Sequence, residues 1–175
     1  MWCDLILEGL AIIINSSSYD RTYYALTIAS LSAAQLQDVQ VLFTYGAVRR
    51  LVKGWVDTIG DETERWIRED LEKGLKEGSI KKISEMITYL KGFGGKIYSC
   101  SAAIAFHNIK KDELIEEVDG IMGVMTFLEK TENSRLLYVW CDLFSSLQLI
   151  KLAKINRSLR DYLKAVGRVE TFVNL

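Results

Sequence analysis

The segment KIYSCSAAIAFHN, residues 96–108, contains the residue best placed for chemistry, the thiol of Cys100. An apolar, strand-like triplet leads into the cysteine, and the small residues that follow are typical of a helix that begins at Ser101. Backbone N–H groups at the start of a helix lack intrahelical partners and carry a partial positive charge, so they favour a thiolate over a neutral thiol. The pattern predicts a reactive Cys100; the alternative is a buried cysteine that only fills space in the core.

Other residues are expected to gather around this thiol, because ligands of open parallel sheets bind beyond the carboxyl ends of the strands. A serine-rich turn follows the first predicted strand, a tyrosine and a glycine follow the second, and a serine follows the cysteine itself. The serine turn can donate hydrogen bonds to an anion or a persulfide, or it can simply cap the next helix. The expected binding residues are Ser16, Ser17, Ser18, Tyr45, Gly46, Ser101 and His107.

His107 follows Cys100 by seven residues, which suggests a cysteine–histidine pair but separates the two side chains. Seven residues of α-helix rise about 10 Å, whereas a general base must lie about 3 Å from the atom whose proton it takes. Only a break in the helix would bring His107 back toward the thiol. We therefore expect His107 to cap the end of the helix or to lie in a subunit contact.

Short apolar segments alternate with longer amphipathic segments from residue 10 to residue 140. Runs of β-branched and aromatic residues predict strands, and apolar residues at every third or fourth position predict helices. Their alternation predicts parallel β-α units and a three-layer α/β/α sandwich with a mainly parallel sheet. The predicted strands are 10–14, 39–45, 96–100 and 135–140, and the predicted helices are 19–37, 47–52, 61–78, 79–95, 101–107, 110–118 and 120–130.

Length and composition limit how the chain is organised. Residues 1–140 are expected to form one α/β domain, followed by a helical tail over residues 141–175. The net charge of −1 gives no overall field that would select nucleic acid. No apolar run reaches 18 residues, and acidic residues interrupt the apolar N-terminus, so we expect a cytoplasmic protein without a signal peptide or membrane span.

The three cysteines, Cys3, Cys100 and Cys141, predict neither a disulfide framework nor a metal site. Their number is odd, no C-x-x-C motif is present, and the chain's one histidine cannot complete a common zinc site with them. We therefore expect no metal site, and transfer chemistry at the Cys100 thiol would require no organic cofactor.

Residues 141–175 have the pattern of a basic amphipathic helix. Six basic residues lie mostly opposite an apolar stripe, which consists of Leu152, Ile155, Leu159, Tyr162, Leu163 and Val166. Apolar faces of this size are rarely exposed on monomers, so the tail is expected to pack on its own sheet or on another subunit. Attachment to a membrane surface is the alternative.

Four segments together resemble the DsrE/DsrF-like family of small sulfur-relay proteins. The segments are LAIIINSSSYDRTYYALTIA, VLFTYGAVRRLVKG, KIYSCSAAIAFHNIKKDELIEEV and GVMTFLEK, and the resemblance spans about residues 9–139. It implies a five-stranded parallel sheet between helix layers and assembly into homo-oligomers. It also implies that Cys100, at the family's active cysteine position, carries sulfur as a persulfide and exchanges it with a TusA-like sulfur carrier or a rhodanese-like donor.

Three functions from different classes remain open from the sequence. The leading hypothesis is a sulfur-relay protein that holds sulfane sulfur on Cys100. The first alternative is a non-catalytic oligomeric binding or scaffold module that uses the tail, residues 141–175, as a docking element. The second is a thiol peroxidase, suggested by peroxiredoxin-like labels on similar longer chains, with Cys141 as the resolving thiol.

Overall fold

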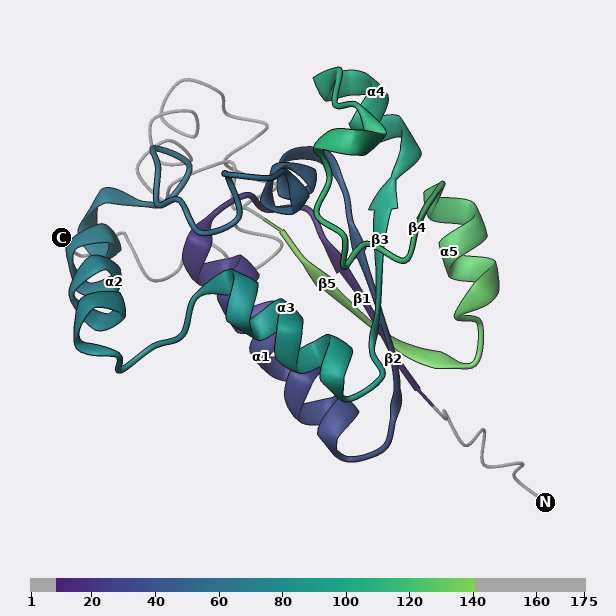
Figure 1. Cartoon of the computed structure of the whole chain (residues 1–175). Helices are drawn as coiled ribbons and strands as arrows, with labels where there is room; N and C mark the ends of the chain where they lie inside the picture. Colours follow the sequence, from purple (N-terminus) through teal and green to yellow (C-terminus); the bar gives the residue numbers. More distant parts are fainter. Residues whose placement is uncertain (1–8, 141–175) are drawn as a thin grey trace, which may run out of the picture. The chain divides into compact units, whose positions relative to one another are not determined.

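The computed structural model describes residues 9–140. The predictions about Cys3, Cys141 and the tail concern residues outside this range. A parallel five-stranded sheet forms the centre of the described part, with the strand order β4-β3-β2-β1-β5 (Figure 1). The strands are β1 (Gly9–Ile14), β2 (Asp38–Phe43), β3 (Lys96–Cys100), β4 (Gly120–Met122) and β5 (Ser134–Val139).

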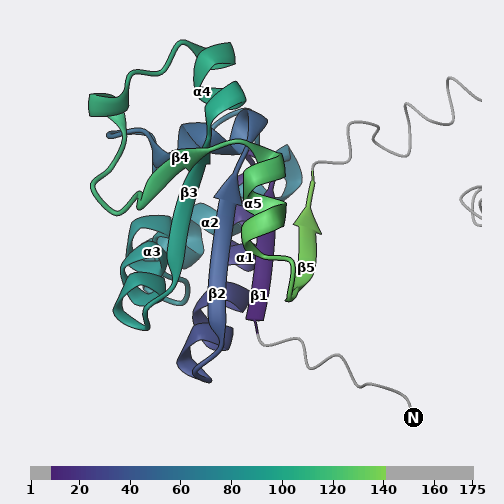
Figure 2. The ribbon, with the colours of Figure 1, turned by 90° about the vertical axis from the view of Figure 1, so that its right-hand side faces the viewer.

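Helices lie on both sides of the sheet, which confirms the predicted three-layer α/β/α fold. Helices α1 (Tyr19–Ala34) and α3 (Ile83–Gly92) lie side by side on one face, and α5 (Val124–Lys130) lies on the other (Figure 2). Within the described part no helix has the length and apolar character needed to cross a membrane.

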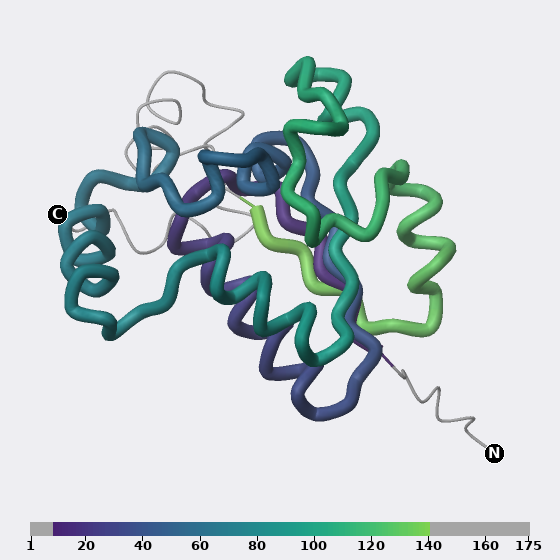
Figure 3. The backbone as a smooth tube through the Cα atoms, viewed as in Figure 1, coloured from purple at the N-terminus to yellow at the C-terminus, as the bar shows by residue number. Residues whose placement is uncertain are grey.

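Shorter elements connect these layers. The 3₁₀ helix η1 (Tyr45–Leu51) follows β2, and the backbone then makes a long excursion through α2 (Arg65–Glu77) before it reaches α3 (Figure 3). Helix α4 (Ser101–His107) follows β3, and the 3₁₀ turn η2 (Lys111–Glu113) leads toward β4.

Side-chain alternation along the strands divides the core between the two faces. On β1, Ile12 and Ile14 join the large apolar cluster under α1 and α3. Ala11 and Ile13 point to the opposite face and join a smaller cluster with Phe127 of α5. Strands buried on both faces show nearly continuous apolar runs, as β1 and β2 do.

One predicted helix starts too early, and another is mostly absent. Residues 120–122 form β4, which pairs with β3 from Tyr98 to Cys100, and the helix begins only at Val124. The predicted helix over residues 110–118 is reduced to η2, after which Leu114 forms an antiparallel bridge with Val52. In both places, pairing with a distant segment outweighs the local helical pattern.

Candidate functional site

Cys100 ends β3 and is the N-cap residue of α4, as predicted. It is the only cysteine among residues 9–140, and it is not part of a disulfide. The residue is only 4% exposed and lies in the smaller apolar cluster with Val48 of η1, Ala103 of α4 and Phe127 of α5. The thiol therefore stands at the carboxyl-end rim of the sheet but is largely covered by neighbouring side chains.

In the serine turn after β1, two of the three hydroxyl groups form hydrogen bonds with nearby residues. The hydroxyl of Ser16 accepts a hydrogen bond from the Ser18 amide at 3.2 Å, and the hydroxyl of Ser18 donates to Asp20. Both serines are buried, and Ser18 is the N-cap residue of α1. Ser18 thus occupies the N-cap position without a side-chain cap hydrogen bond, and the hydroxyls of Ser16 and Ser18 are used in these local contacts.

Ser17 lies against the turn that follows β2. A Cβ atom added to Gly46 would meet the Ser17 hydroxyl oxygen at 3.2 Å, so the lack of a side chain at Gly46 allows this close approach. The preceding residue, Tyr45, has a φ angle of 41°, which is uncommon for a residue with a side chain, and its ring is 62% exposed. The structure therefore brings Ser17 and Gly46 together, next to an exposed tyrosine.

Ser101 and His107 lie at opposite ends of α4. An added Cβ at Gly123, just before α5, would lie 3.9 Å from the Ser101 hydroxyl oxygen, so Ser101 is near the β4–α5 turn. His107 instead lines a cavity of about 190 Å³ at the far end of the helix, where its ring contacts Phe106 edge-on. The α-helix between Cys100 and His107 is unbroken, so the geometry offers no cysteine–histidine pair.

The point where the strand order reverses, between β1 and β5, is filled by contacts within the chain. Ligands of open parallel sheets often bind at such a point. Here the Asn15 side chain donates to the Tyr138 hydroxyl at 2.9 Å, and Arg21 donates to the Trp140 carbonyl at 2.8 Å. The rim near Cys100 is therefore the better candidate.

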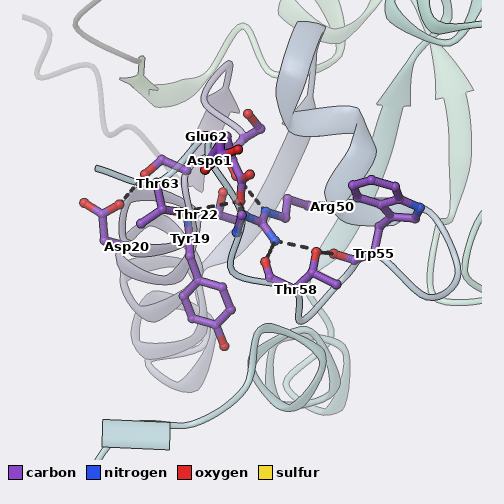
Figure 4. Close-up of polar contacts among 12 residues, drawn as sticks. Tyr19, Asp20, Thr22, Arg50, Trp55, Thr58, Asp61, Glu62 and Thr63 are labelled. Atoms are coloured by element: carbon purple, nitrogen blue, oxygen red, sulfur yellow. Dashed lines mark hydrogen bonds and ion pairs between the residues drawn. The ribbon is translucent and has the colours of Figure 1, made fainter. Parts of the chain in front are cut away.

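A buried arginine next to this rim was not predicted from the sequence. Arg50 of η1 is 3% exposed, and its guanidinium group donates hydrogen bonds to several backbone carbonyls (Figure 4). Its Nε donates to the Ser17 carbonyl at 2.7 Å, and its Nη1 donates to the Thr58 carbonyl. Weaker contacts of 3.4 Å reach the carbonyls of Trp55 and Val56. Arg50 thus ties the turn after β1 to the loop that follows η1.

The charge of Arg50 is balanced by one carboxylate. Its Nη2 donates to Glu62 Oε1 at 2.5 Å, and the same oxygen accepts the Gly60 amide at 3.0 Å. Burial lowers the pKa of Arg50, and the Glu62 carboxylate acts in the opposite direction. In the sequence Arg49 and Arg50 look alike, and no signal indicates which of the two is buried.

A profile of the DsrE/DsrF-like family matches residues 8–138, more than half of the chain. The chain belongs to the DsrE/DsrF-like family. This confirms the resemblance in the four sequence segments, and the family is associated with sulfur relay in general. A search of curated proteins finds no match.

Two solved structures are similar to this DsrE/DsrF-like chain. The YchN protein from E. coli is 15% identical with a TM-score of 0.55, and the match covers 77% of this chain and 99% of YchN. MTH1491 from Methanobacterium thermoautotrophicum, a protein of unknown function, is 17% identical with a TM-score of 0.47, over 74% of this chain and 97% of that one. At such low identity the likeness to YchN supports the fold and nothing finer.

The chemistry available at the rim of this DsrE/DsrF-like domain centres on one thiol. Residues 9–140 contain no cluster of histidine, cysteine and carboxylate side chains that could hold a metal ion. The thiol is followed directly by the first residues of α4, whose amide N–H groups have no carbonyl partner within the helix. Such a site suits exchange reactions at sulfur.

The buried phenol of Tyr19, which lies beside Arg50, predicts alkaline sensitivity. Its ring centroid is 5.5 Å from the Arg50 guanidinium carbon, and burial raises the pKa of Tyr19 to about 12. Below the ordinary pKa of 10 the phenol is neutral in both states; as the pH rises from 10 to 12 the unfolded chain ionises first, and stability falls. We expect the free energy of unfolding to fall by about 2 kcal/mol between pH 10 and 12, and we expect this fall to be absent in Tyr19→Phe.

The measurement is urea unfolding at a series of pH values. Tyr24→Phe is the matched control, because Tyr24 lies in the same helix but is 64% exposed. A pH dependence between 10 and 12 that is the same in wild type and Tyr19→Phe would show that Tyr19 is not its source.

Proposed function

We propose that this protein is a sulfur-relay protein that carries sulfane sulfur as a persulfide on Cys100. The observation that carries the proposal is the position of Cys100, at the carboxyl end of a central strand in a DsrE/DsrF-like domain. Membership of a family associated with sulfur relay supports the same chemistry.

The proposed step is a thiolate exchange that needs no oxidant and no cofactor. The Cys100 thiolate attacks the outer sulfur of a donor persulfide, so that a new S–S bond forms and the donor's S–S bond breaks. The donor leaves as a thiolate, and Cys100 becomes Cys–S–S⁻. Attack by an acceptor thiolate on the outer sulfur of Cys100 then regenerates the Cys100 thiolate.

The exchange partners that we propose are small proteins of the same relay. A TusA-like sulfur carrier or a rhodanese-like donor would present its own persulfide to the rim, and the relay protein would act as a homo-oligomer. Because Cys100 is 4% exposed, the side chains around it must separate before a partner's sulfur can reach it. The amides at the start of α4 would stabilise the thiolate before transfer and the persulfide anion after it.

The proposal is tested by incubating the full-length protein with a low-molecular-weight persulfide donor and weighing the intact chain. We expect a gain equal to the mass of one or more sulfur atoms, mapped by peptide analysis to the segment that contains Cys100. The gain should disappear after treatment with a thiol reductant. No gain under native conditions, or a gain mapped only to Cys3 or Cys141, would contradict the proposal.

The burial of Cys100 favours a second candidate function, an oligomeric binding or scaffold module without sulfur chemistry. Its low exposure and its apolar neighbours are those of a cysteine that only packs. The loading experiment separates the two functions when it is repeated in urea. A carrier loads in its native state, whereas a scaffold loads at Cys100 only after the chain unfolds.

A further inference from the structure

The cavity at the C-terminal end of α4 has two charged walls of opposite sign. It has a volume of about 190 Å³ and lies between η1 with its following loop on one side and η2 with the end of α4 on the other. Its charged residues are Arg49 and Glu113, and Trp55, Val52 and Ile109 supply apolar surface. Cys100 is not part of its lining.

Arg49 supplies the cationic wall with its hydrogen-bond donors free. Its guanidinium carbon lies 4.9 Å from the centre of the Trp55 ring, an arrangement that fixes the plane of the group. This cation–π contact is the interaction that the Arg49 side chain makes within residues 9–140, where it forms neither a hydrogen bond nor an ion pair. Its planar set of N–H groups matches the two oxygens of a carboxylate.

Glu113 supplies the anionic wall from an exposed position in which hydrogen bonds hold its backbone. One carboxylate oxygen accepts the Lys110 amide at 2.6 Å, and the Glu113 carbonyl accepts the Lys53 amide at 2.9 Å. The bridge between Val52 and Leu114 joins the same two segments. The backbone therefore fixes the position of Glu113 relative to the loop that follows Arg49.

The two charges of this cavity do not neutralise each other directly. No ion pair joins Arg49 and Glu113 in the described part of the chain, although both line the same small space. The arrangement leaves a cation and an anion on separate walls with room between them. A ligand that carries both charges could pair with Arg49 through its anionic group and with Glu113 through its cationic group.

We propose that this cavity binds a small zwitterion of the free α-amino acid class. The carboxylate would lie against the Arg49 guanidinium and the ammonium group against the Glu113 carboxylate, with a short side chain on Val52 and Ile109. The cavity volume of about 190 Å³ suits a ligand of the size of a small amino acid. Drug-sized ligands and cofactors fill pockets of about 300–1,000 Å³.

Binding of a zwitterion is tested by NMR on the full-length protein. L-Alanine, acetate and methylammonium are each titrated to about 10 mM, which would saturate a site with a Kd near 1 mM. The Trp55 indole N–H, the Arg49 Nε–H and the side-chain amide of Asn108, another lining residue, report on the cavity. We expect L-alanine to shift these signals, and acetate and methylammonium to bind at least about tenfold more weakly, because each satisfies one wall only.

Matched variants assign the two walls. Arg49→Gln and Glu113→Gln are each expected to weaken L-alanine binding at least about tenfold, and Glu113→Gln keeps an acceptor for the Lys110 amide. Lys111→Gln, an exposed change in the same 3₁₀ turn, should leave binding unchanged. Arg49→Lys keeps the charge without the planar donors and should fall between wild type and Arg49→Gln.

Several results would overturn the zwitterion site. They are the absence of any shift with L-alanine, acetate binding as tight as L-alanine binding, and equal affinities in wild type, Arg49→Gln and Glu113→Gln. The site does not use the thiol, so Cys100→Ala should bind L-alanine as wild type does. The site and the sulfur-relay function can therefore fail independently.

Discussion

Cys100→Ala is expected to abolish sulfur loading while the chain stays folded. The substitution removes the only sulfur atom within residues 9–140 that can form a persulfide, so the expected change is complete loss at this segment. Alanine suits the test better than serine, because the site is 4% exposed and apolar. A buried serine hydroxyl without a partner costs about 1–3 kcal/mol, whereas alanine leaves only a small gap.

The matched control for this loss keeps Cys100 as the only cysteine. Cys3→Ser combined with Cys141→Ser should load as much sulfur as wild type, measured by intact mass after the same donor treatment. The unfolding midpoint in urea shows whether each variant is folded under the assay conditions. Undiminished loading in folded Cys100→Ala would remove Cys100 from the mechanism.

The position of the thiol could be predicted from the sequence because its signals are local. An apolar triplet before Cys100 predicts the end of a strand, and the small residues from Ser101 predict a helix start; both boundaries are confirmed. The convergence of turns at one edge follows from parallel strands alone, and the proximity of Ser17 to Gly46 agrees with it. Topology of this kind can be inferred from the alternation of segments.

The burial of the thiol could not be predicted, because it depends on contacts between distant segments. Val48 and Phe127 lie 52 residues before and 27 residues after Cys100 in the sequence, and both pack in its cluster. Strand β4 was missed for a similar reason. Its three residues are too few to show an alternating pattern, and only pairing with β3 makes them a strand.

Helix starts were also misplaced where tertiary contacts replace local caps. The helix predicted over residues 61–78 begins only at Arg65, although Asp61 and Glu64 have the spacing of a capping box four residues earlier. Asp61 instead accepts a hydrogen bond from Arg68 at 2.8 Å, and the Thr63 hydroxyl accepts the Tyr19 amide at 3.0 Å. The Thr63 contact attaches the loop before α2 to the start of α1, and the Asp61 contact joins the same loop to α2 itself, so the local capping pattern does not decide where the helix starts.

Arg50→Met is expected to cause the largest loss of stability among substitutions in the described part, because Arg50 binds the loop before α2 through several hydrogen bonds. Methionine fills a similar volume but leaves the Glu62 carboxylate and the Ser17 and Thr58 carbonyls without their donors. Removing one partner of a fully buried ion pair typically costs about 3–5 kcal/mol, and because the Glu62 side chain is partly exposed we expect about 3 kcal/mol for this pair. Because small domains are stable by about 5–15 kcal/mol in total, we expect a much lower unfolding midpoint in urea. Glu62→Gln should cost less, since the Glu62 side chain is 29% exposed and glutamine still accepts from Arg50.

Arg49→Met provides the matched control, because Arg49 is the adjacent residue in η1 but is exposed, and its side chain only stacks on Trp55. Loss of an exposed cation–π contact costs about 0.5–1 kcal/mol. The difference between the two arginine variants therefore measures the buried network rather than the loss of positive charge. Added salt should reduce this difference only slightly, since buried pairs are poorly screened. Equal destabilisation by the two variants would mean that Arg50 contributes no more than a surface arginine. Other contacts would then hold the loop after η1 against the turn after β1.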